Sequence, residues 1–403
     1  MPPLKIGILL SQPLDYSIGT DIRILSLAKA LRDLGIDVLI LSPFPLKVNY
    51  VRGIPVYCIF NDFLGVFRLA MNIAKEIMKY KSRYNILSQI KIMTKLAKII
   101  ASKLTRIVDN LDLSIIQAEQ EFAALVCSNI RSHIDIPIVV DFHGIWPEEL
   151  IASNIIKRGS QDHINILKLE RYLANNTDII VVVSEEMRDY VIDVYEADPN
   201  IVYVIPNATF PRQSRRLLDY RADTVVYAGT VTFRENVPLL INSLSIVKDK
   251  FPKVRLYITN RGDALSFLKR QFHKRGVKPC YYWFDNAEEF YRFLTTCHVG
   301  VIPALKHIWR QMATPAKLYD YLSAGVPVVA VDIGASWNEI IRKRKVGILT
   351  DDDPQSFAEG ILELLHDPEL IYEYGNRAIE LVKKELNYWK SAEKLLKIYK
   401  KLG

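Results

Sequence analysis

TPAKLYDYLSAGVPVVAV, residues 314–331, joins a helical stretch to an apolar run in eighteen positions. Its Thr-Pro pair is typical of a helix start, with Thr314 as the cap and Pro315 at the first helical position. The run Pro327–Val331 predicts a short strand that is apolar on both faces. Such strands are typical of parallel sheets that are covered by helices on both sides.

The same alternation of short apolar runs and amphipathic helical runs continues on both sides of this stretch. Predicted strands are Lys5–Leu10, Asp37–Leu41, Leu113–Gln117, Pro137–Phe142, Asp178–Val183, Ile201–Ile205, Thr224–Ala228, Arg255–Thr259, Pro279–Phe284 and His298–Ile302, besides Pro327–Val331. Helical runs such as Asp21–Asp33 and Gln120–Ser132 lie between them, and Pro206–Asp223 has no period and reads as a linker. The sequence therefore predicts an α/β protein with two doubly wound, Rossmann-like domains that face each other across a cleft.

Length and composition agree with this architecture. The chain has 403 residues, which is too long for one ordinary domain and fits two of roughly 150–200 residues. Half of the residues are hydrophobic and 24% are charged, which excludes a disordered, collagen-like or disulfide-scaffold protein. The four cysteines are far apart and form no C-x-x-C, so a zinc site or disulfide framework is not expected. The first ten residues read as a strand rather than a signal peptide.

The positive charge is concentrated in one segment. The net charge is +8, and residues 65–107 hold ten basic residues and one acid, a balance of +9. Within this segment Ser88–Leu104 has the pattern of a basic amphipathic helix. Such a helix suits an anionic membrane surface, and it is also compatible with the solvated face of an ordinary domain helix. Nucleic acid is not an expected partner, because no aromatic stacking platform accompanies the charge.

Candidate functional residues in the first half follow predicted strands, because ligands of doubly wound sheets bind at the carboxyl ends of the strands. Gly19 and Thr20 precede the first helix, where a glycine allows close approach of an anion. The absence of G-x-G-x-x-G argues against a nicotinamide or flavin enzyme. His143 follows Pro137–Phe142 and can donate a hydrogen bond to a sugar hydroxyl or stabilise a departing group. Ser184 is expected to cap the helix after Asp178–Val183.

The second half carries a second set at the same kind of position. Gly229 and Thr230 close one strand, and Arg234 follows. The predicted helix start at Thr314, Pro315 and Ala316 would direct amide groups and the positive end of a helix dipole at a diphosphate. Lys317 adds a full charge, and Asp320 can accept two hydrogen bonds from a ribose diol. A base pocket is expected near Phe284 and Asp285.

These motifs together resemble the GT-B glycosyltransferases of family 4, also called glycosyl transferase group 1. Residues 315–330 resemble the pattern P-x-K-L-x-E-Y-L-x-x-G-x-P-V-V-A. Further agreement comes from residues 141–144 (DFHG), 183–185 (VSE), 206–208 (PNA) and 227–229 (YAG). The resemblance covers almost the whole chain. It implies an acceptor-binding domain over 1–210, a nucleotide-sugar-binding domain over 222–380, and a C-terminal helix over 381–403 that crosses back onto the first domain.

The resemblance implies transfer of a sugar from a UDP- or GDP-linked donor to a lipid-linked or glycan acceptor, with retention and without a metal or another cofactor. It implies catalytic roles for His143, Lys317 and Arg234, and an acceptor side near Trp146 and Glu148. With the basic segment, it predicts a cytoplasmic protein that is peripheral on the inner face of the plasma membrane.

The sequence departs from the family pattern at the diphosphate. Thr230 and Glu235 stand where the family usually has Arg and Lys, and Met312 replaces the first Glu of its Glu-x7-Glu motif. The diphosphate must therefore be held by Arg234, Lys317 or Arg310. Two alternatives stay open: a non-catalytic nucleotide-sugar-binding subunit, and a nucleotide-sugar epimerase or hydrolase on the same fold.

Overall fold

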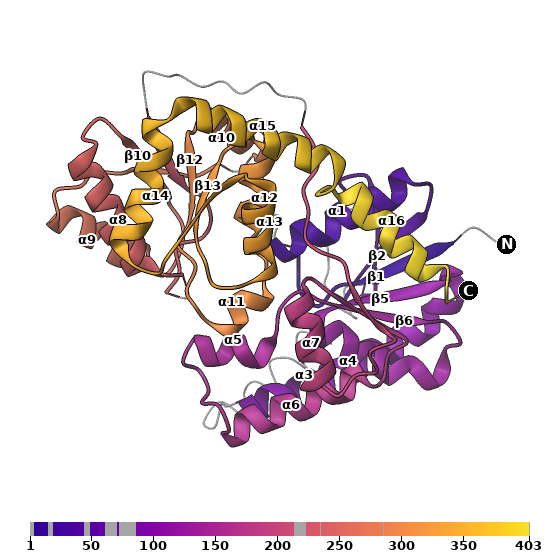
Figure 1. The fold of residues 1–403 in the computed structure, drawn as a ribbon. Helices are drawn as coiled ribbons and strands as arrows, with labels where there is room; N and C mark the ends of the chain where they lie inside the picture. Colours follow the sequence, from indigo (N-terminus) through magenta and orange to yellow (C-terminus); the bar gives the residue numbers. More distant parts are fainter. Residues whose placement is uncertain are drawn as a thin grey trace. The chain divides into compact units, whose positions relative to one another are not determined.

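The computed structural model in Figure 1 describes residues 4–14, 19–43, 49–60, 71, 86–212, 223–233, 235–284 and 286–402. The chain divides into two compact units. The N-terminal unit contains Met1–Pro206 and Trp389–Gly403, and the C-terminal unit contains Asn207–Tyr388. Among the described residues, no helix combines the length and the apolar character that crossing a bilayer requires.

The N-terminal unit is built on an eight-stranded sheet in the order β3-β4-β2-β1-β5-β6-β7-β8. Every neighbouring pair is parallel except β3 with β4. The strands are β1 (Lys5–Leu9), β2 (Asp37–Ser42), β3 (Tyr50–Val51), β4 (Ile54–Cys58), β5 (Ile115–Glu119), β6 (Ile138–Phe142), β7 (Ile179–Val182) and β8 (Val202–Val204). The strand order reverses between β1 and β5, which makes their carboxyl ends the expected place for a ligand.

Helices of the N-terminal unit connect these strands. They are α1 (Gly19–Asp33), α3 (Ile86–Leu111), α4 (Gln120–Ile130), α5 (Trp146–Ala152), α6 (Gln161–Ala174) and α7 (Glu185–Asp193). The predicted cap is confirmed, since the Ser184 hydroxyl accepts from the backbone N–H of Met187 at 3.1 Å. The run predicted as one helix from Gln120 to Ser132 is α4 followed by a short 3-10 helix at Arg131–His133. Of the basic segment 65–107, only Met71 and residues 86–107 lie within the described residues.

The last helix, α16 (Tyr388–Tyr399), packs on the N-terminal unit from Trp389 onward. The Trp389 indole Nε1 donates to Asp33 Oδ2 at 2.9 Å. On the inner face of the helix, Leu395 and Tyr399 are completely buried. The helix begins at Tyr388 rather than at residue 381, which lies inside the preceding helix α15 (Pro368–Lys384).

The C-terminal unit has a six-stranded, fully parallel sheet in the order β11-β10-β9-β12-β13-β14. In sequence order this is 3-2-1-4-5-6, the arrangement of dinucleotide-binding domains, with the reversal between β9 and β12. The strands are β9 (Thr224–Tyr227), β10 (Arg255–Thr259), β11 (Cys280–Tyr282), β12 (Val299–Ile302), β13 (Val328–Val331) and β14 (Gly347–Thr350). All four residues of β13 are completely buried, as its apolar sequence predicts.

Helices lie on both faces of this second sheet, with α8 and α14 on one side and α12 and α13 on the other (Figure 1). Besides α15 they are α8 (Val237–Lys250), α9 (Leu265–Lys274), α10 (Ala287–Leu294), α11 (Ile308–Met312), α12 (Ala316–Ser323), α13 (Ser336–Arg344) and α14 (Pro354–His366). Gly300 in β12 leaves room for α12, since a Cβ there would lie 2.6 Å from the Tyr321 ring. The Tyr321 hydroxyl donates to the Val226 carbonyl at 3.0 Å and ties α12 to β9.

The predicted fold class is confirmed in both units, and all eleven predicted strands are present with ends that differ by at most two residues. Three strands were not predicted. Strand β4 contains Pro55, a residue that argues against a strand, and β3 is only two residues long. Strand β14 begins at Gly347 on an edge of the sheet.

Candidate functional site

In the N-terminal unit, the carboxyl ends of β5 and β6 place three ionisable side chains together. Glu119 and Asp141 are register partners on the neighbouring strands, and His143 follows β6 on the same face because side chains alternate along a strand. His143 Nε2 lies 2.8 Å from Glu119 Oε2 and 3.6 Å from Asp141 Oδ2. Both carboxylates are about 1% exposed, so their interactions are with protein groups rather than with solvent.

Asp141 is also held by Arg23 from helix α1. The Arg23 Nε and Nη2 atoms lie 3.1–3.3 Å from the Asp141 carboxylate, and both side chains are buried. A buried carboxylate is tolerated when a charged partner satisfies it. Although burial acts to raise the pKa of Asp141, Arg23 and His143 outweigh it and hold that pKa below its ordinary value.

The surroundings of His143 favour the charged form of its ring. Burial disfavours the charged ring, but Asp141 and Glu119 outweigh burial and raise the pKa of His143 to about 9. Its Nδ1 atom is buried and has no hydrogen-bond partner among the described residues. A protonated imidazole donates from both nitrogens, so Nδ1–H is a hydrogen-bond donor that no described protein group uses. Sequence reasoning placed His143 correctly at a strand end, but it did not identify Glu119 or Arg23.

The ligand atoms of Glu119, Asp141 and His143 lie within 4.8 Å of one another, close enough to hold a metal ion. The chemistry of this donor set does not favour one. A histidine must be neutral to bind a metal, and these two carboxylates stabilise its protonated form. Asp141 already accepts hydrogen bonds from Arg23. We therefore describe the three residues with Arg23 as a network of two basic and two acidic side chains.

The other residues predicted for the site in the N-terminal unit lie at the start of α1 and in a small apolar cluster. Gly19 is the first residue of α1, and the Thr20 hydroxyl accepts weakly from Gln120 Nε2 at 3.5 Å. Trp146 packs against the small apolar cluster of Ile86, Ile156 and Ile166.

Glu148 is not available to an acceptor, contrary to the prediction. It is completely buried, and its carboxylate accepts from both terminal nitrogens of Arg158 at 2.5–2.8 Å and from the Tyr190 hydroxyl at 3.1 Å. On helix α5 this side chain points into the unit, so its three hydrogen bonds satisfy it internally.

In the C-terminal unit, one carboxylate holds two buried cations near the reversal between β9 and β12. Lys317 Nζ lies 3.4 Å from Glu235 Oε2, and Arg310 Nη2 forms a close ion pair with Glu235 Oε1. Lys317 Nζ also lies 3.2 Å from the Tyr227 hydroxyl and 4.4 Å from the centre of its ring. With three charges of which two are positive, the cluster keeps a net charge of about +1.

Burial opposes charge throughout this cluster. It lowers the pKa of Lys317, and Arg310 acts in the same direction while Glu235 opposes it. Burial acts to raise the pKa of Glu235, but Lys317 and Arg310 outweigh it and hold that pKa below its usual value. The charged forms of Lys317 and Glu235 therefore stabilise each other. An anionic ligand would balance the remaining positive charge of the cluster.

Gly229 makes space for Lys317. Its φ of +127° is in the region that side chains disfavour, and a Cβ there would lie 2.8 Å from Lys317 Cε. The Gly229 N–H donates to the Thr259 hydroxyl at 3.1 Å, which fixes the turn after β9. Thr230 beside it is exposed, and its carbonyl accepts from Tyr227.

Helix α12 starts one residue later than the sequence predicts. Its cap is Pro315, with an extended backbone (φ −63°, ψ 122°), and no side chain caps the helix. Thr314 is therefore not the cap; its side chain is mostly buried and its carbonyl accepts from Asn207 Nδ2 at 3.5 Å. No side chain of the described residues caps the N–H groups of Ala316 and Lys317, the kind of groups that bind an anion at a helix start.

Asp320 lies one turn into α12, as predicted. Burial raises its pKa to about 6, and Arg212 acts in the opposite direction. Phe284 packs in an aromatic cluster with Tyr282, Phe290 and Phe293, at centroid distances of 5.4–6.4 Å. Arg234 and Asp285 lie outside the described residues.

Comparisons with known proteins agree with this geometry. The family model described as "Glycosyltransferase Family 4" matches residues 19–211, and that described as "Glycosyl transferases group 1" matches residues 222–367. A relative from Methanocaldococcus jannaschii, named uncharacterized glycosyltransferase MJ1607, is 23% identical over 238 residues, 55% of this chain and 59% of the relative. The chain spans between 21% and 59% of the length of the curated relatives it matches.

Solved structures of similar fold cover nearly the whole chain. Sucrose-phosphate synthase from Thermosynechococcus elongatus has a TM-score of 0.75 at 14% identity, with 99% of both chains covered. Anabaena Alr3699/HepE, solved in complex with UDP-glucose, has a TM-score of 0.72 at 15% identity, with 99% of this chain and 100% of that chain covered. Two matching family models and two doubly wound units lead to one conclusion: the chain belongs to the group 1, family 4 glycosyltransferases of GT-B fold.

Proposed function

We propose that this protein is a retaining glycosyltransferase that moves a sugar from a UDP- or GDP-linked donor to a lipid-linked or glycan acceptor. The observation that carries the proposal is the pair of buried cations, Lys317 and Arg310, beside the uncapped start of α12. Cations and free helix amides stabilise a diphosphate, which is the leaving group of such donors. A structural relative, Anabaena HepE, was solved in complex with UDP-glucose.

The donor nucleotide is assigned to the C-terminal unit. Its diphosphate would bind at the N–H groups of Ala316 and Lys317, where it would complete the charge balance of the cluster. Asp320 would accept hydrogen bonds from the ribose diol when it is ionised, which its pKa of about 6 allows at neutral pH. Phe284 and its aromatic neighbours would border the base.

His143 is assigned as a hydrogen-bond donor to the donor sugar. Its charge is supported by Glu119 and Asp141, and its Nδ1–H has no protein partner in the described part of the chain. A buried, charged donor stabilises negative charge on a departing group or fixes a sugar hydroxyl. A metal ion would not be required for this stabilisation.

Retention is expected to proceed by attack on the face from which the nucleotide leaves. The acceptor hydroxyl oxygen bonds to the anomeric carbon, the bond from that carbon to the diphosphate oxygen breaks with its electron pair, and the diphosphate takes up the hydroxyl proton. Glu119 and Asp141 are engaged by His143 and Arg23, so neither is placed as a nucleophile. Positioning and electrostatic stabilisation would carry most of the rate.

The test combines binding with product analysis. Thermal unfolding would be followed with UDP, GDP, ADP and their common sugars, because a ligand of the folded state raises its stability. The donor that binds would then be incubated with acceptor preparations, and the anomeric configuration of the product read by NMR. Hydrolysis without acceptor would favour the hydrolase alternative, and a changed donor sugar would favour the epimerase.

A non-catalytic nucleotide-sugar-binding subunit is the second candidate, and one observation favours it. Glu235 neutralises part of the positive charge that a departing diphosphate needs. This candidate predicts donor binding without turnover for every acceptor.

We also propose that helix α3 contacts the anionic inner face of the plasma membrane. Four exposed basic residues lie along one side of the helix: Lys91, Lys95, Lys98 and Arg106. Steps of three or four residues, or of two such turns, bring side chains to the same side of a helix. Among the described residues, no carboxylate lies within ion-pair distance of Lys98 or Arg106. Each basic residue near an anionic surface contributes about 1 kcal/mol.

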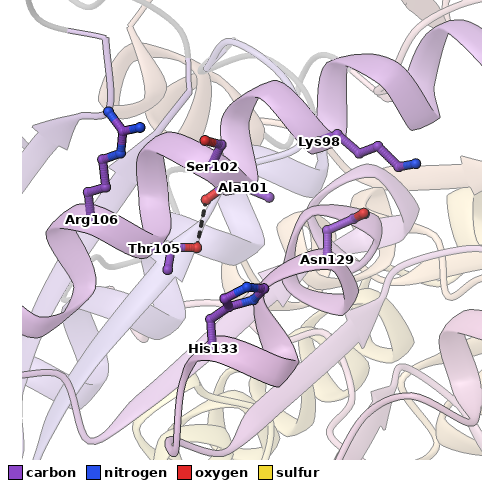
Figure 2. Close-up of a pocket in the computed structure, with 7 residues that line it drawn as sticks. All are labelled: Lys98, Ala101, Ser102, Thr105, Arg106, Asn129 and His133. Atoms are coloured by element: carbon purple, nitrogen blue, oxygen red, sulfur yellow. Dashed lines mark hydrogen bonds between the residues drawn. The ribbon is translucent and has the colours of Figure 1, made fainter.

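A small cavity beside this row of charges could take a phosphate group. It has a volume of about 330 Å³ and is lined by Lys98, Ala101, Ser102, Thr105, Arg106, Asn129 and His133. Figure 2 shows Lys98 and Arg106 extending from α3 in different directions, with Asn129 and His133 on a neighbouring segment. The Asn129 Nδ2 already donates to the Leu125 carbonyl, so its Oδ1 is left to accept from a ligand hydroxyl.

Flotation with vesicles of phosphatidylglycerol and phosphatidylcholine tests this contact. The wild type is expected to float at low salt and to dissociate at high salt, since surface charges are screened. Replacing Lys91, Lys95, Lys98 and Arg106 with Gln should abolish flotation. The matched control replaces four exposed lysines of the C-terminal unit, Lys250, Lys253, Lys274 and Lys278. Equal flotation of both variants would refute the role of α3.

A further inference from the structure

Two hydrogen bonds and an ion pair form a chain that joins the C-terminal helix to His143. The Tyr399 hydroxyl on α16 donates to Gln117 Oε1 in β5. Gln117 Nε2 donates in turn to Glu119 Oε1 at 2.6 Å. The other oxygen of that carboxylate, Oε2, lies 2.8 Å from His143 Nε2. Tyr399 and His143 are thus connected through two side chains of one strand.

Every member of this chain is buried. Tyr399 is completely buried, and Gln117 and Glu119 are each about 1% exposed. Water therefore does not readily replace a lost partner, and a buried polar group without a hydrogen bond is costly. Gln117 and Glu119 lie two residues apart on β5, so both side chains point to the same face of the sheet.

The direction of the chain is fixed by its chemistry. An ionised Glu119 only accepts hydrogen bonds, so the Gln117 amide must present its NH2 group to it. The Gln117 oxygen is then turned toward α16, where the Tyr399 hydroxyl is its donor. With Oε1 held by Gln117, the second oxygen of Glu119 is directed at His143.

We propose that Tyr399 and Gln117 are positioning residues that hold Glu119, and through it His143, in the geometry for sugar transfer. The inference rests on the proposed function, in which His143 contacts the donor. It assigns to the C-terminal helix a role in the chemistry besides packing. Neither Tyr399 nor Gln117 needs to contact a substrate.

The charge on His143 is expected to depend on this chain. The charged groups around it are Asp141, Glu119, Glu121 and Arg23. Burial raises the pKa of Glu119 above its ordinary value, and His143 and the Gln117 hydrogen bond act in the opposite direction. Without that bond Glu119 binds a proton more readily, its support of the His143 charge weakens, and the pKa of His143 falls from about 9.

The experiment uses Tyr399→Phe, Gln117→Met and the double variant in the full-length protein. Each single variant should lower kcat by about 3- to 10-fold, the equivalent of one net hydrogen bond, and change the donor KM less than about twofold. The alkaline limb of the pH profile should move to lower pH. Because both residues act through Glu119, the double variant should lose little more than either single variant.

Tyr203→Phe is the matched control. In the described part of the chain, its hydroxyl accepts from the exposed Nζ of Lys401, at 3.4 Å, and Lys401 lies two residues after Tyr399. It should leave kcat and the pH profile unchanged. If Tyr399→Phe behaves like this control, or if the two single losses multiply in the double variant, the inference is wrong. Thermal unfolding of each variant identifies any loss that comes from misfolding.

A measurement without substrate separates this inference from the proposed function. NMR titration of the histidine ring signals, with His143→Gln used for assignment, reads the pKa of His143 directly. It should be near 9 in the wild type and lower in Tyr399→Phe and Gln117→Met. If the pKa of His143 is the same in the variants and the wild type, the positioning role of Tyr399 and Gln117 is refuted, even if the enzyme is active. If that pKa shifts but no assay detects turnover, only the proposed glycosyltransferase activity is refuted.

Discussion

Glu235 lies 3.4 Å from Lys317, the residue that the sequence singles out for the diphosphate, and its other carboxylate oxygen is paired with Arg310. At the position where the family usually has a lysine, this chain therefore has an anion that organises two cations from neighbouring helices. Without a ligand, Lys317 and Arg310 pair with Glu235. A bound diphosphate would have to share these two cations with Glu235. We expect the affinity for the donor to depend on how strongly Glu235 competes with the diphosphate for Lys317 and Arg310.

The variant Glu235→Gln should bind UDP or GDP more tightly than the wild type. Its ligand-free form should be less stable. Nucleotide affinity is expected to rise by roughly tenfold, which corresponds to about 1.4 kcal/mol. The free energy of unfolding should fall by ~3 kcal/mol, because two buried cations lose their partner. Calorimetric titration and denaturant unfolding measure the two effects.

The matched control for that variant is Glu339→Gln. Glu339 also contacts two cations, Arg342 and Lys343, but on the exposed surface of α13. It should change neither affinity nor stability by more than about 1 kcal/mol. A weaker nucleotide affinity in Glu235→Gln would show that Glu235 assists donor binding.

Lys317→Ala should lower kcat by about 100-fold or more while the fold is retained, because it removes a charge from the developing diphosphate. Glu235 keeps Arg310 as its partner in this variant, so unfolding should shift only modestly. Steady-state kinetics with the identified donor gives the rate, and Lys343→Ala on the exposed face of α13 is the control. Unchanged turnover would remove Lys317 from the site.

Gly229→Ala should weaken donor binding because its new methyl group would displace Lys317. Gly276→Ala is a close control, since Gly276 also has a positive φ of +68° but nothing lies within 4 Å of an added Cβ. Both variants place a Cβ at a positive φ, and the backbone strain is larger at Gly229, whose φ of +127° lies outside the left-handed helical region that Gly276 occupies. Only Gly229→Ala should change the nucleotide-induced rise in melting temperature, and equal rises in both would contradict the role assigned to Gly229.

Glu170→Gln should stabilise the protein at pH 8 and have little effect at pH 5. Glu170 is completely buried without a hydrogen-bond partner among the described residues, and burial raises its pKa well above the ordinary value. A raised pKa means that its contribution to folding is favourable when protonated and is lost as the pH rises through the folded value. Urea unfolding at the two pH values measures the difference.

A second carboxylate provides the opposite case for comparison. Glu148 is equally buried but is satisfied by Arg158 and Tyr190, so Glu148→Gln should destabilise the protein at pH 8. If Glu170→Gln also destabilised it at pH 8, an unrecognised partner of Glu170 would be implied.

Local pattern was enough for the order of the elements and for the strand ends at which the candidate residues lie. A strand was predicted at Pro327–Val331 because consecutive apolar residues are typical of a strand covered on both sides, and the observed strand, Val328–Val331, is completely buried. His143 and Gly229 were found because each follows a predicted strand. Pattern failed where the element was short or interrupted, as in Tyr50–Val51 and in Ile54–Cys58 with its proline.

The role of a polar side chain was harder to predict than its position. Glu148 follows a strand and reads as a site residue, yet it faces inward and is satisfied by Arg158. The cap of α12 is Pro315 rather than Thr314, which no local rule of helix starts indicated.

The sequence by itself determined the α/β alternation, the two doubly wound units and the strand ends that carry polar residues, because hydrophobic periodicity is a property of neighbouring positions. Only the tertiary structure decided which charges meet: Lys317 with Glu235, Asp141 with Arg23, and Tyr399 with Gln117, which is 282 positions away. Such pairs depend on strand order, on register and on the face that a helix buries. These are set when the whole core packs, and no short segment contains them.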